Sequence, residues 1–86
     1  MSRHPCTLIV RGSDGLPLAG IRFVVEQAQE PVPEMGYVTG PDGQAHVGLP
    51  AGEATIRFFL PQGRSQKSVL DIDPQSAHPY SVTLAT

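Results

Sequence analysis

The chain has 86 residues and a net charge of −2, and its six Lys and Arg residues are scattered rather than clustered. Nucleic acids and anionic membranes are bound by clustered positive charge that displaces counterions, so the composition excludes both as partners. A chain of this length is expected to form one domain, residues 1–86. Nine Gly and nine Pro residues, with 40% hydrophobic residues, favour short strands joined by tight turns over a helical bundle.

The cysteine content and the N-terminal segment bear on the compartment. Cys6 is the only cysteine, so the chain cannot close the internal disulfides that small secreted domains usually carry. The first ten residues lack the apolar core and cleavage site of a signal peptide, and no apolar run is long enough to span a bilayer. We therefore expect a cytoplasmic location, with export by a dedicated secretion machine as an alternative.

The first half of the chain contains two strand-like runs separated by turn residues. Residues 6–11 are rich in β-formers, with Leu8 and Val10 expected to face inward, and a Gly-Ser-Asp-Gly turn follows at residues 12–15. Residues 21–27 alternate strictly, with Ile21, Phe23 and Val25 on one face and Arg22, Val24 and Glu26 on the other. This period of two predicts a half-buried strand rather than a helix.

The second half repeats the same pattern several times. A Pro-containing segment at residues 28–34 is expected to be a loop or an edge, and strands are expected at 36–40, 44–49, 53–60, 67–73 and 79–86. The positions expected to face inward are Ala45, Val47, Leu49, Ala54, Ile56, Phe58, Leu60, Leu70, Ile72, Tyr80, Val82 and Leu84. Short strands with closely spaced turns predict an all-β fold, a seven-stranded antiparallel Greek-key β-sandwich.

Three turn motifs give the chain a family resemblance. Residues 15–20 read Gly-Leu-Pro-Leu-Ala-Gly, residues 39–44 read Thr-Gly-Pro-Asp-Gly-Gln, and residues 47–52 read Val-Gly-Leu-Pro-Ala-Gly. In this order, and with β-rich runs between them, they resemble the transthyretin-like (prealbumin-like) and carboxypeptidase-regulatory-like β-sandwich domains. The motifs specify turns, so the resemblance concerns fold more than activity.

The resemblance implies a non-catalytic accessory module that binds another protein. Similar domains lie at the tips of bacterial type VI secretion spikes, where they carry an effector. A short chain of this kind would suit an adaptor, with an effector, a toxin or a spike protein as its partner. On this hypothesis the chain is not an enzyme and needs no cofactor.

Two other functions remain as alternatives. The 5-hydroxyisourate hydrolases share the transthyretin fold, and His4, Arg57 and His78 occur in the order of that family's site residues. The C-terminal Tyr-Arg-Gly-Ser of those enzymes is missing here, because the chain ends Ser-Val-Thr-Leu-Ala-Thr. The second alternative is a structural spacer or oligomerising domain.

Metal and nucleophile chemistry have weak support in the sequence. His4 and Cys6 are two residues apart and could share a strand face, but a metal site needs further converging ligands. Asp71 and Asp73 have the same spacing, whereas calcium requires at least six oxygens. A nucleophilic Cys6 would need a neighbouring base in a pocket. We predict no metal site and no catalytic residue.

The sequence does predict a surface that could bind a protein. Val24 and Phe59 fall on the outward positions of two strands that are expected to be neighbours in the sandwich, with Arg22 and Arg57 on the same faces. Aromatic and Arg side chains concentrate binding energy at interfaces, so these four residues are the candidate partner-binding site. The alternative is that they are scattered exposed residues without a role. An open sheet edge that accepts a partner's strand is a second route, with the prolines of residues 31–33 guarding one edge.

Overall fold

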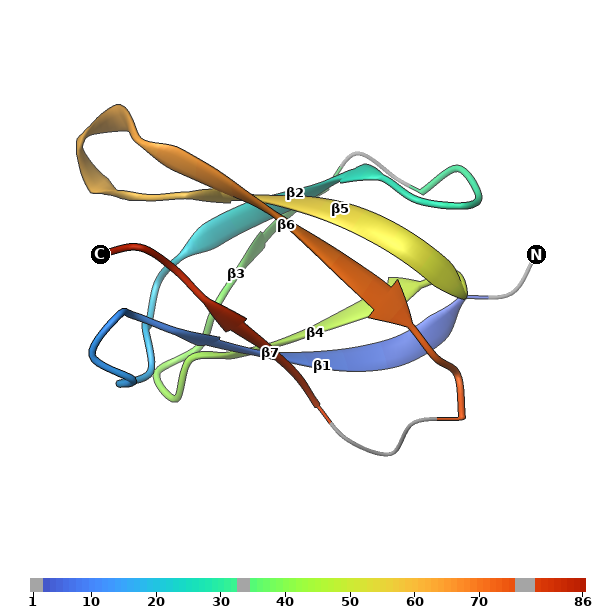
Figure 1. The fold of residues 1–86 in the computed structure, drawn as a ribbon, viewed down its shortest axis with the longest axis horizontal. Coiled ribbons are helices and arrows are strands. Elements are labelled where there is room, and N and C mark those ends of the chain that lie inside the picture. Colours follow the sequence, from blue (N-terminus) through green and yellow to red (C-terminus); the bar gives the residue numbers. More distant parts are fainter. Residues whose placement is uncertain (1–2, 33–34, 76–78) are drawn as a thin grey trace.

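The computed structural model describes residues 3–32, 35–75 and 79–86. In this part of the chain, seven β-strands form two sheets that pack face to face (Figure 1). The prediction of an all-β, sandwich-like fold is therefore confirmed. Among these described residues there is no helix long and apolar enough to cross a membrane.

The three-stranded sheet has the order β4-β1-β7. It contains β1 (His4–Arg11), β4 (Gln44–Leu49) and β7 (Tyr80–Thr83). β1 and β4 pair antiparallel, but β1 and β7 run parallel, so the prediction of a wholly antiparallel fold is wrong at this pair. Antiparallel pairing follows naturally where a short turn joins two strands. β1 and β7 lie at opposite ends of the chain, and no such turn constrains their directions.

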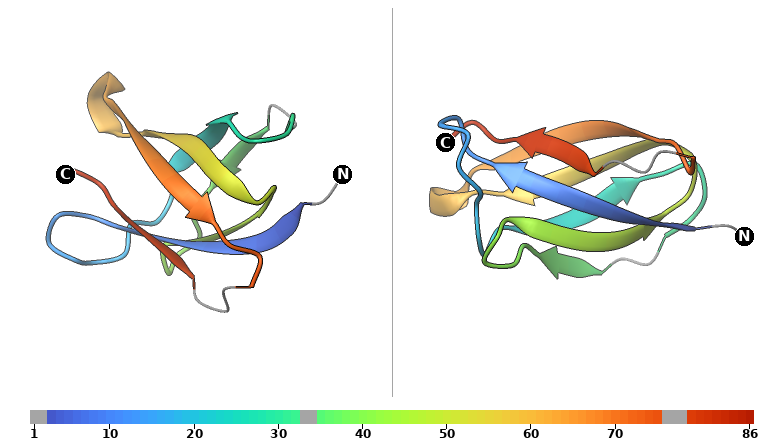
Figure 2. Two further views of the ribbon diagram at one scale, coloured as in Figure 1. Left: turned by 45° about the vertical axis from the view of Figure 1, so that its right-hand side comes forward. Right: turned by 90° about the horizontal axis from the view of Figure 1, so that it is seen from below.

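The four-stranded sheet has the order β3-β2-β5-β6 and is antiparallel throughout (Figure 2). Its strands are β2 (Arg22–Gln27), β3 (Gly36–Val38), β5 (Gly52–Phe59) and β6 (Ser65–Ile72). A short 3-10 turn, Pro61–Gly63, joins β5 to β6. The β2–β5 ladder shifts register between Val25 and Gln27, which makes Glu26 the extra residue of a β-bulge.

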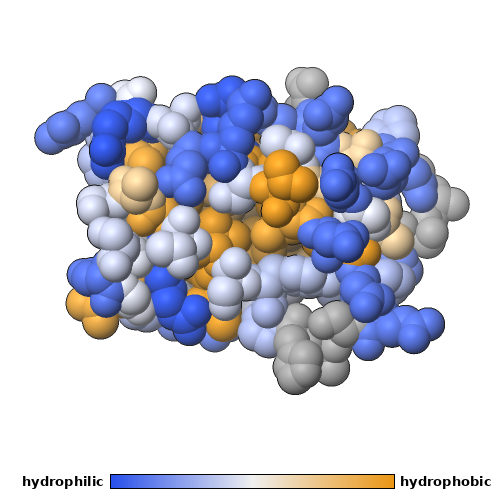
Figure 3. Space-filling view, viewed as in Figure 1, coloured by the Kyte–Doolittle hydropathy of each residue, from blue (hydrophilic) through white to orange (hydrophobic). Residues whose placement is uncertain are grey.

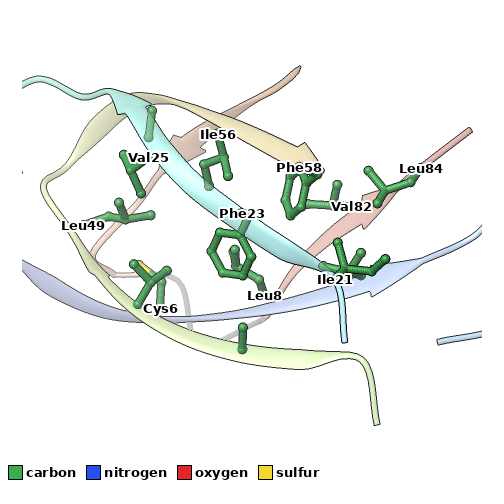
Figure 4. Close-up of a cluster of buried hydrophobic side chains, with 14 of the residues drawn as sticks. Cys6, Leu8, Ile21, Phe23, Val25, Leu49, Ile56, Phe58, Val82 and Leu84 are labelled. Carbon is green, nitrogen blue, oxygen red and sulfur yellow. The ribbon is translucent and has the colours of Figure 1, made fainter. Parts of the chain in front are cut away.

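The core lies between the two sheets and follows the predicted alternation (Figure 4). Phe23 stacks on Tyr37 with ring centroids 5.3 Å apart and contacts Phe58 at the same centroid distance. Leu70 packs against the core but is only partly buried, because β6 is an edge strand. The fully or nearly buried apolar residues are Cys6, Leu8, Val10, Ile21, Phe23, Val25, Ala45, Val47, Leu49, Ala54, Ile56, Phe58, Leu60, Ile72, Val82 and Leu84.

The turn between β3 and β4 is held against the rest of the fold by hydrogen bonds and close packing. Buried Thr39 accepts a hydrogen bond from the Ile21 N–H at 2.9 Å and donates one to the Leu18 carbonyl at 2.7 Å. Gly43 has a φ of +76°, and a Cβ at this position would lie 2.8 Å from the Val10 carbonyl oxygen. Only glycine fits such a close approach at positive φ, which explains the Pro-Asp-Gly sequence of this turn.

Candidate protein-binding face

The four predicted site residues are neighbours on the outer face of the four-stranded sheet. Arg22 of β2 is directly opposite Phe59 of β5, and Val24 is directly opposite Arg57. Their side chains point away from the core, since Phe23, Ile56 and Phe58 occupy the inward positions between them. Two cross-strand pairs therefore place both apolar residues and both arginines in one patch. We call these four residues the outer-face patch.

The apolar part of the patch extends onto β3. Val38 is opposite Arg22 in the β2–β3 ladder, and its side chain is 59% exposed. Phe59 is 43% exposed and lies between buried Phe58 and buried Leu60, as strand alternation requires of an outward residue. A shallow hollow in this surface is lined by residues of three strands: Arg22, Phe23, Val24, Gly36, Tyr37, Val38 and Phe59. An exposed aromatic beside a hollow offers a place for an apolar side chain of another protein.

Arg57 is fixed in place by its neighbours. Its Nε donates a hydrogen bond to Glu26 Oε2 at 2.7 Å, and its Nη1 donates to Ser65 Oγ at 2.8 Å. Lys67 of β6 lies opposite Arg57 and brings its Nζ to 3.4 Å from the other oxygen of Glu26. The hydrogen bond from Arg57, with the contribution of Lys67, lowers the pKa of the Glu26 carboxyl below its usual value. The Glu26 carboxylate thus lies between two cations.

Arg22 differs from Arg57 in having no such anchor. Within the described residues, no carboxylate lies within ion-pair distance of its guanidinium. Its side chain is exposed at the border of the hollow, opposite Val38 on one side and Phe59 on the other. Guanidinium groups bind carboxylates through paired hydrogen bonds. Arg22 is therefore available to a carboxylate of a partner.

The residues of the hydrolase alternative do not converge where they are described. His4 is two residues from buried Cys6 on β1 and therefore shares its face, on the inward side of the three-stranded sheet. Arg57 lies on the outer face of the other sheet, directed away from the core. His78 lies outside the described residues. The structure thus separates two of the three residues that this alternative requires.

The metal and nucleophile hypotheses gain no geometric support. Burial raises the pKa of the Cys6 thiol, which disfavours the reactive thiolate, and its Sγ contacts the His4 carbonyl oxygen at 3.2 Å. Asp71 and Asp73 are exposed, and Asp73 Oδ1 accepts a hydrogen bond from the Gln75 N–H. Over residues 3–32, 35–75 and 79–86, no group of three His, Cys, Asp or Glu side chains could hold a metal ion.

Sequence reasoning missed three residues of this face: Glu26, Val38 and Lys67. Glu26 shares a face with Arg22 in the alternating pattern, but its contact with Arg57 depends on the pairing of β2 with β5. Val38 alternates with Tyr37, so its outward position followed from the strand pattern once β3 was paired with β2. Lys67 required the β5–β6 register, which the short turn at Pro61–Gly63 sets.

The predicted edge guard is only partly described. Pro31 is exposed in the segment between β2 and β3, whereas residues 33–34 lie outside the described part of the chain.

In comparisons with known proteins, no family model matches the chain, and no curated protein is significantly similar to it in sequence.

Proposed function

We propose that this chain is a non-catalytic protein-binding module that holds its partner on the outer-face patch. The proposal rests on one observation above the others: the ladder between β2 and β5 brings Arg22, Phe59, Val24 and Arg57 into two adjacent cross-strand pairs. Sequence alternation alone did not require these two strands to be neighbours. Their pairing creates a contiguous surface with an aromatic centre and two guanidinium groups.

The patch combines the features that concentrate binding energy in protein interfaces. Phe59 and Val38 expose apolar area that water solvates poorly, and the flanking arginines supply directional hydrogen bonds. The sheet beneath is packed against the core, where Phe23 contacts both Tyr37 and Phe58 on the inner face. A preformed patch loses little conformational entropy when it binds.

The chemistry of the patch favours one kind of contact with a partner. The hollow can hold an apolar side chain beside Phe59, and the Arg22 guanidinium at its border can donate hydrogen bonds to a carboxylate. Arg57 is already neutralised by Glu26, so it contributes shape and hydrogen bonding more than net charge. We therefore expect a protein segment in which an apolar residue and an acidic residue are close together.

The fold and the setting belong to the same proposal. The strand orders β4-β1-β7 and β3-β2-β5-β6 are the support for assigning a transthyretin-like or carboxypeptidase-regulatory-like Greek-key sandwich. Within that group, an adaptor role in a bacterial type VI secretion spike fits a small module with a binding face. The partner would then be an effector, a toxin or a spike protein.

Site-specific photo-crosslinking in the source cells tests the proposal. A photoreactive phenylalanine analogue at position 59 is compared with the same analogue at position 16, where Leu16 is 63% exposed outside the patch. We expect a discrete crosslinked protein from position 59 and not from position 16. Equal crosslinking from both positions, or none from position 59, would contradict a binding face on β2 and β5.

A further inference from the structure

The two edges of the four-stranded sheet differ in the contacts that they make. The side on which β6 and β7 face the viewer has hydrophobic side chains in its middle, with hydrophilic ones around them (Figure 3). There the Gln66 side chain bridges the two sheets, since its Nε2 donates to the Thr83 carbonyl at 3.2 Å and its Oε1 accepts from the Ala85 N–H at 2.8 Å. At the other edge, β3 has β2 as its only neighbour in the sheet. An edge strand with free backbone groups can pair with a strand of another chain.

The register of the β2–β3 ladder fixes which backbone groups of β3 point outward. The Thr39 N–H donates to the Ile21 carbonyl at 3.0 Å, so this position of the ladder is a hydrogen-bonded one. Because hydrogen-bonded and non-hydrogen-bonded pairs alternate in an antiparallel ladder, Tyr37 bonds to β2, and the N–H and C=O groups of Gly36 and Val38 point away from it. Among the described residues, no turn or loop backbone group bonds to them. The prolines expected to guard an edge precede β3 and remove no N–H group from it.

The hollow on the outer face reaches this edge because Gly36 has no side chain. Gly36 lies directly opposite Val24 in the β2–β3 ladder, and both residues line the hollow. A Cβ at Gly36 would meet no atom of a non-adjacent residue within 4 Å, and its φ is not in the left-handed region. Neither packing nor backbone geometry therefore requires a glycine here. A bulky side chain opposite Gly36 on an added strand would occupy this space, as aromatic residues do opposite edge glycines.

Arg22 supplies a charge beside the same space. It is directly opposite Val38 in the β2–β3 ladder, and within the described residues no carboxylate is within ion-pair distance of its guanidinium. Neighbouring strands are about 4.8 Å apart, so a residue opposite Val38 on an added strand would have its Cα about 10 Å from that of Arg22. The long side chains of Arg and Glu together span this distance over the small Val38. The edge thus offers a cation and an apolar space to two residues of one strand.

We propose that β3 accepts, in antiparallel pairing, an extended segment of another protein that has an acidic residue two positions before an aromatic one. The aromatic residue lies opposite Gly36 and fills the hollow beside Val24. The acidic residue lies opposite Val38 and binds Arg22. The outward N–H and C=O groups of β3 complete the ladder. This inference rests on the proposed function, since the added side chains lie on the outer-face patch.

The sequence favours a different protein over a second copy as the occupant. None of the chain's three Phe and two Tyr residues is two positions from an Asp or Glu residue, so no segment of residues 1–86 has the required pattern. Antiparallel pairing is slightly more stable per residue than parallel pairing, and it sets the order of the pattern. On a parallel strand the aromatic residue would come before the acidic one.

Selection from a random heptapeptide library tests the pattern, because multivalent display detects weak contacts. We expect the wild type to enrich the acidic–x–aromatic pattern, with dissociation constants of about 1–100 μM for a contact of this size. Arg22→Glu should replace the acidic position of the selected peptides with a basic one.

A matched pair of glycine variants tests the hollow. Gly36→Val fills it and should weaken the enriched peptides at least about tenfold, measured by fluorescence anisotropy. Gly48→Val is the same substitution on a strand of the other sheet, where a Cβ would lie 3.6 Å from its nearest non-adjacent atom. It should change the affinity by less than about threefold. Urea unfolding checks that each variant is folded.

Peptides without the acidic–x–aromatic pattern, peptides in the reverse order, or a charge preference that ignores Arg22→Glu would overturn the proposal. Self-association of the wild type at about 1 mM that Gly36→Val abolishes would assign the edge to a second copy instead. The two proposals can fail separately. A discrete crosslink from position 59 that persists in Gly36→Val would keep the binding face and reject the added strand, whereas the absence of any crosslink there contradicts the proposed function itself.

Discussion

Phe58 and Phe59 are adjacent on β5 and have opposite environments. Phe58 is fully buried against Phe23, whereas Phe59 is 43% exposed on the outer face opposite Arg22. The same contrast holds along β2, where Phe23 faces the core and Arg22 and Val24 face outward. A strand of period two thus separates residues that stabilise the fold from residues that are free to bind.

The largest expected effect comes from exchanging the two phenylalanines in turn for alanine. Phe58→Ala removes a ring from the packed core and leaves a cavity, so we expect a loss of about 3–5 kcal/mol in unfolding free energy. Phe59→Ala removes a partly exposed ring and should cost less than about 1 kcal/mol. Urea denaturation of both variants measures the difference. Equal losses would mean that the outer face also holds the fold together.

Two glycines extend the comparison to the turns. Gly43 and Gly15 have φ values of +76° and +83°, but only at Gly43 would a Cβ collide with the core, 2.8 Å from the Val10 carbonyl oxygen. Gly43→Ala should therefore cost about 2–4 kcal/mol, from backbone strain and steric overlap. Gly15→Ala introduces backbone strain without a steric overlap, so it should lower the unfolding free energy by only about 1–2 kcal/mol. Thermal or urea unfolding of the pair checks this order, and a larger loss at Gly15 would contradict the packing of the turn.

The hydroxyl of Thr39 supplies the third test. Thr39→Val keeps the shape but leaves the Ile21 N–H and the Leu18 carbonyl without their partner, at a cost of about 1–3 kcal/mol. Thr55 is partly buried on the outer face of β5 and has no hydrogen bond from its hydroxyl among the described residues. Thr55→Val is the matched control and should change stability by less than about 0.5 kcal/mol. Similar values for both would show that the buried hydroxyl is not needed.

The smallest effect is a pH dependence on the outer face. The pKa of Glu26 in the folded chain lies below its ordinary value of 4.5, because Arg57 and Lys67 favour the carboxylate. The stabilisation of the fold by the Glu26 carboxylate is therefore present above pH 4.5 and is lost as the pH falls through the lowered pKa. Glu26→Gln should flatten this part of the pH profile, measured by urea midpoints between pH 6 and pH 3. An unchanged profile would show that the carboxylate is not held by its two cations.

The sequence predicted the local features of the fold well. Alternation identified the inward residues of β2, β4 and β5, because each of these strands has one buried face. The parallel β1–β7 pair was missed, since no turn links strands from the two chain ends. The partial burial of Leu70 was missed for a related reason: its place at an edge depends on the strand order.

The composition of the candidate site and the proximity of its two strands were predicted, but the ion pairs around it were not. Periodicity placed Arg22, Val24, Arg57 and Phe59 outward, and the β2–β5 ladder then made them neighbours. The ion pair between Glu26 and Arg57 depends on the β2–β5 pairing, and the bulge beside it is one extra residue that leaves no clear mark in a single sequence. Long-range pairings of this kind come from packing the whole chain rather than from local pattern.

The affinity of the crosslinked partner for Phe59→Ser and Arg22→Glu, with Leu16→Ser as the control, tests the central claim most directly. We predict that each of the first two variants weakens binding at least about tenfold. The control should leave the affinity unchanged, and all three should unfold within about 1 kcal/mol of the wild type. Wild-type affinity in both patch variants, measured by calorimetry with purified proteins, would contradict a binding role for the outer face of β2 and β5.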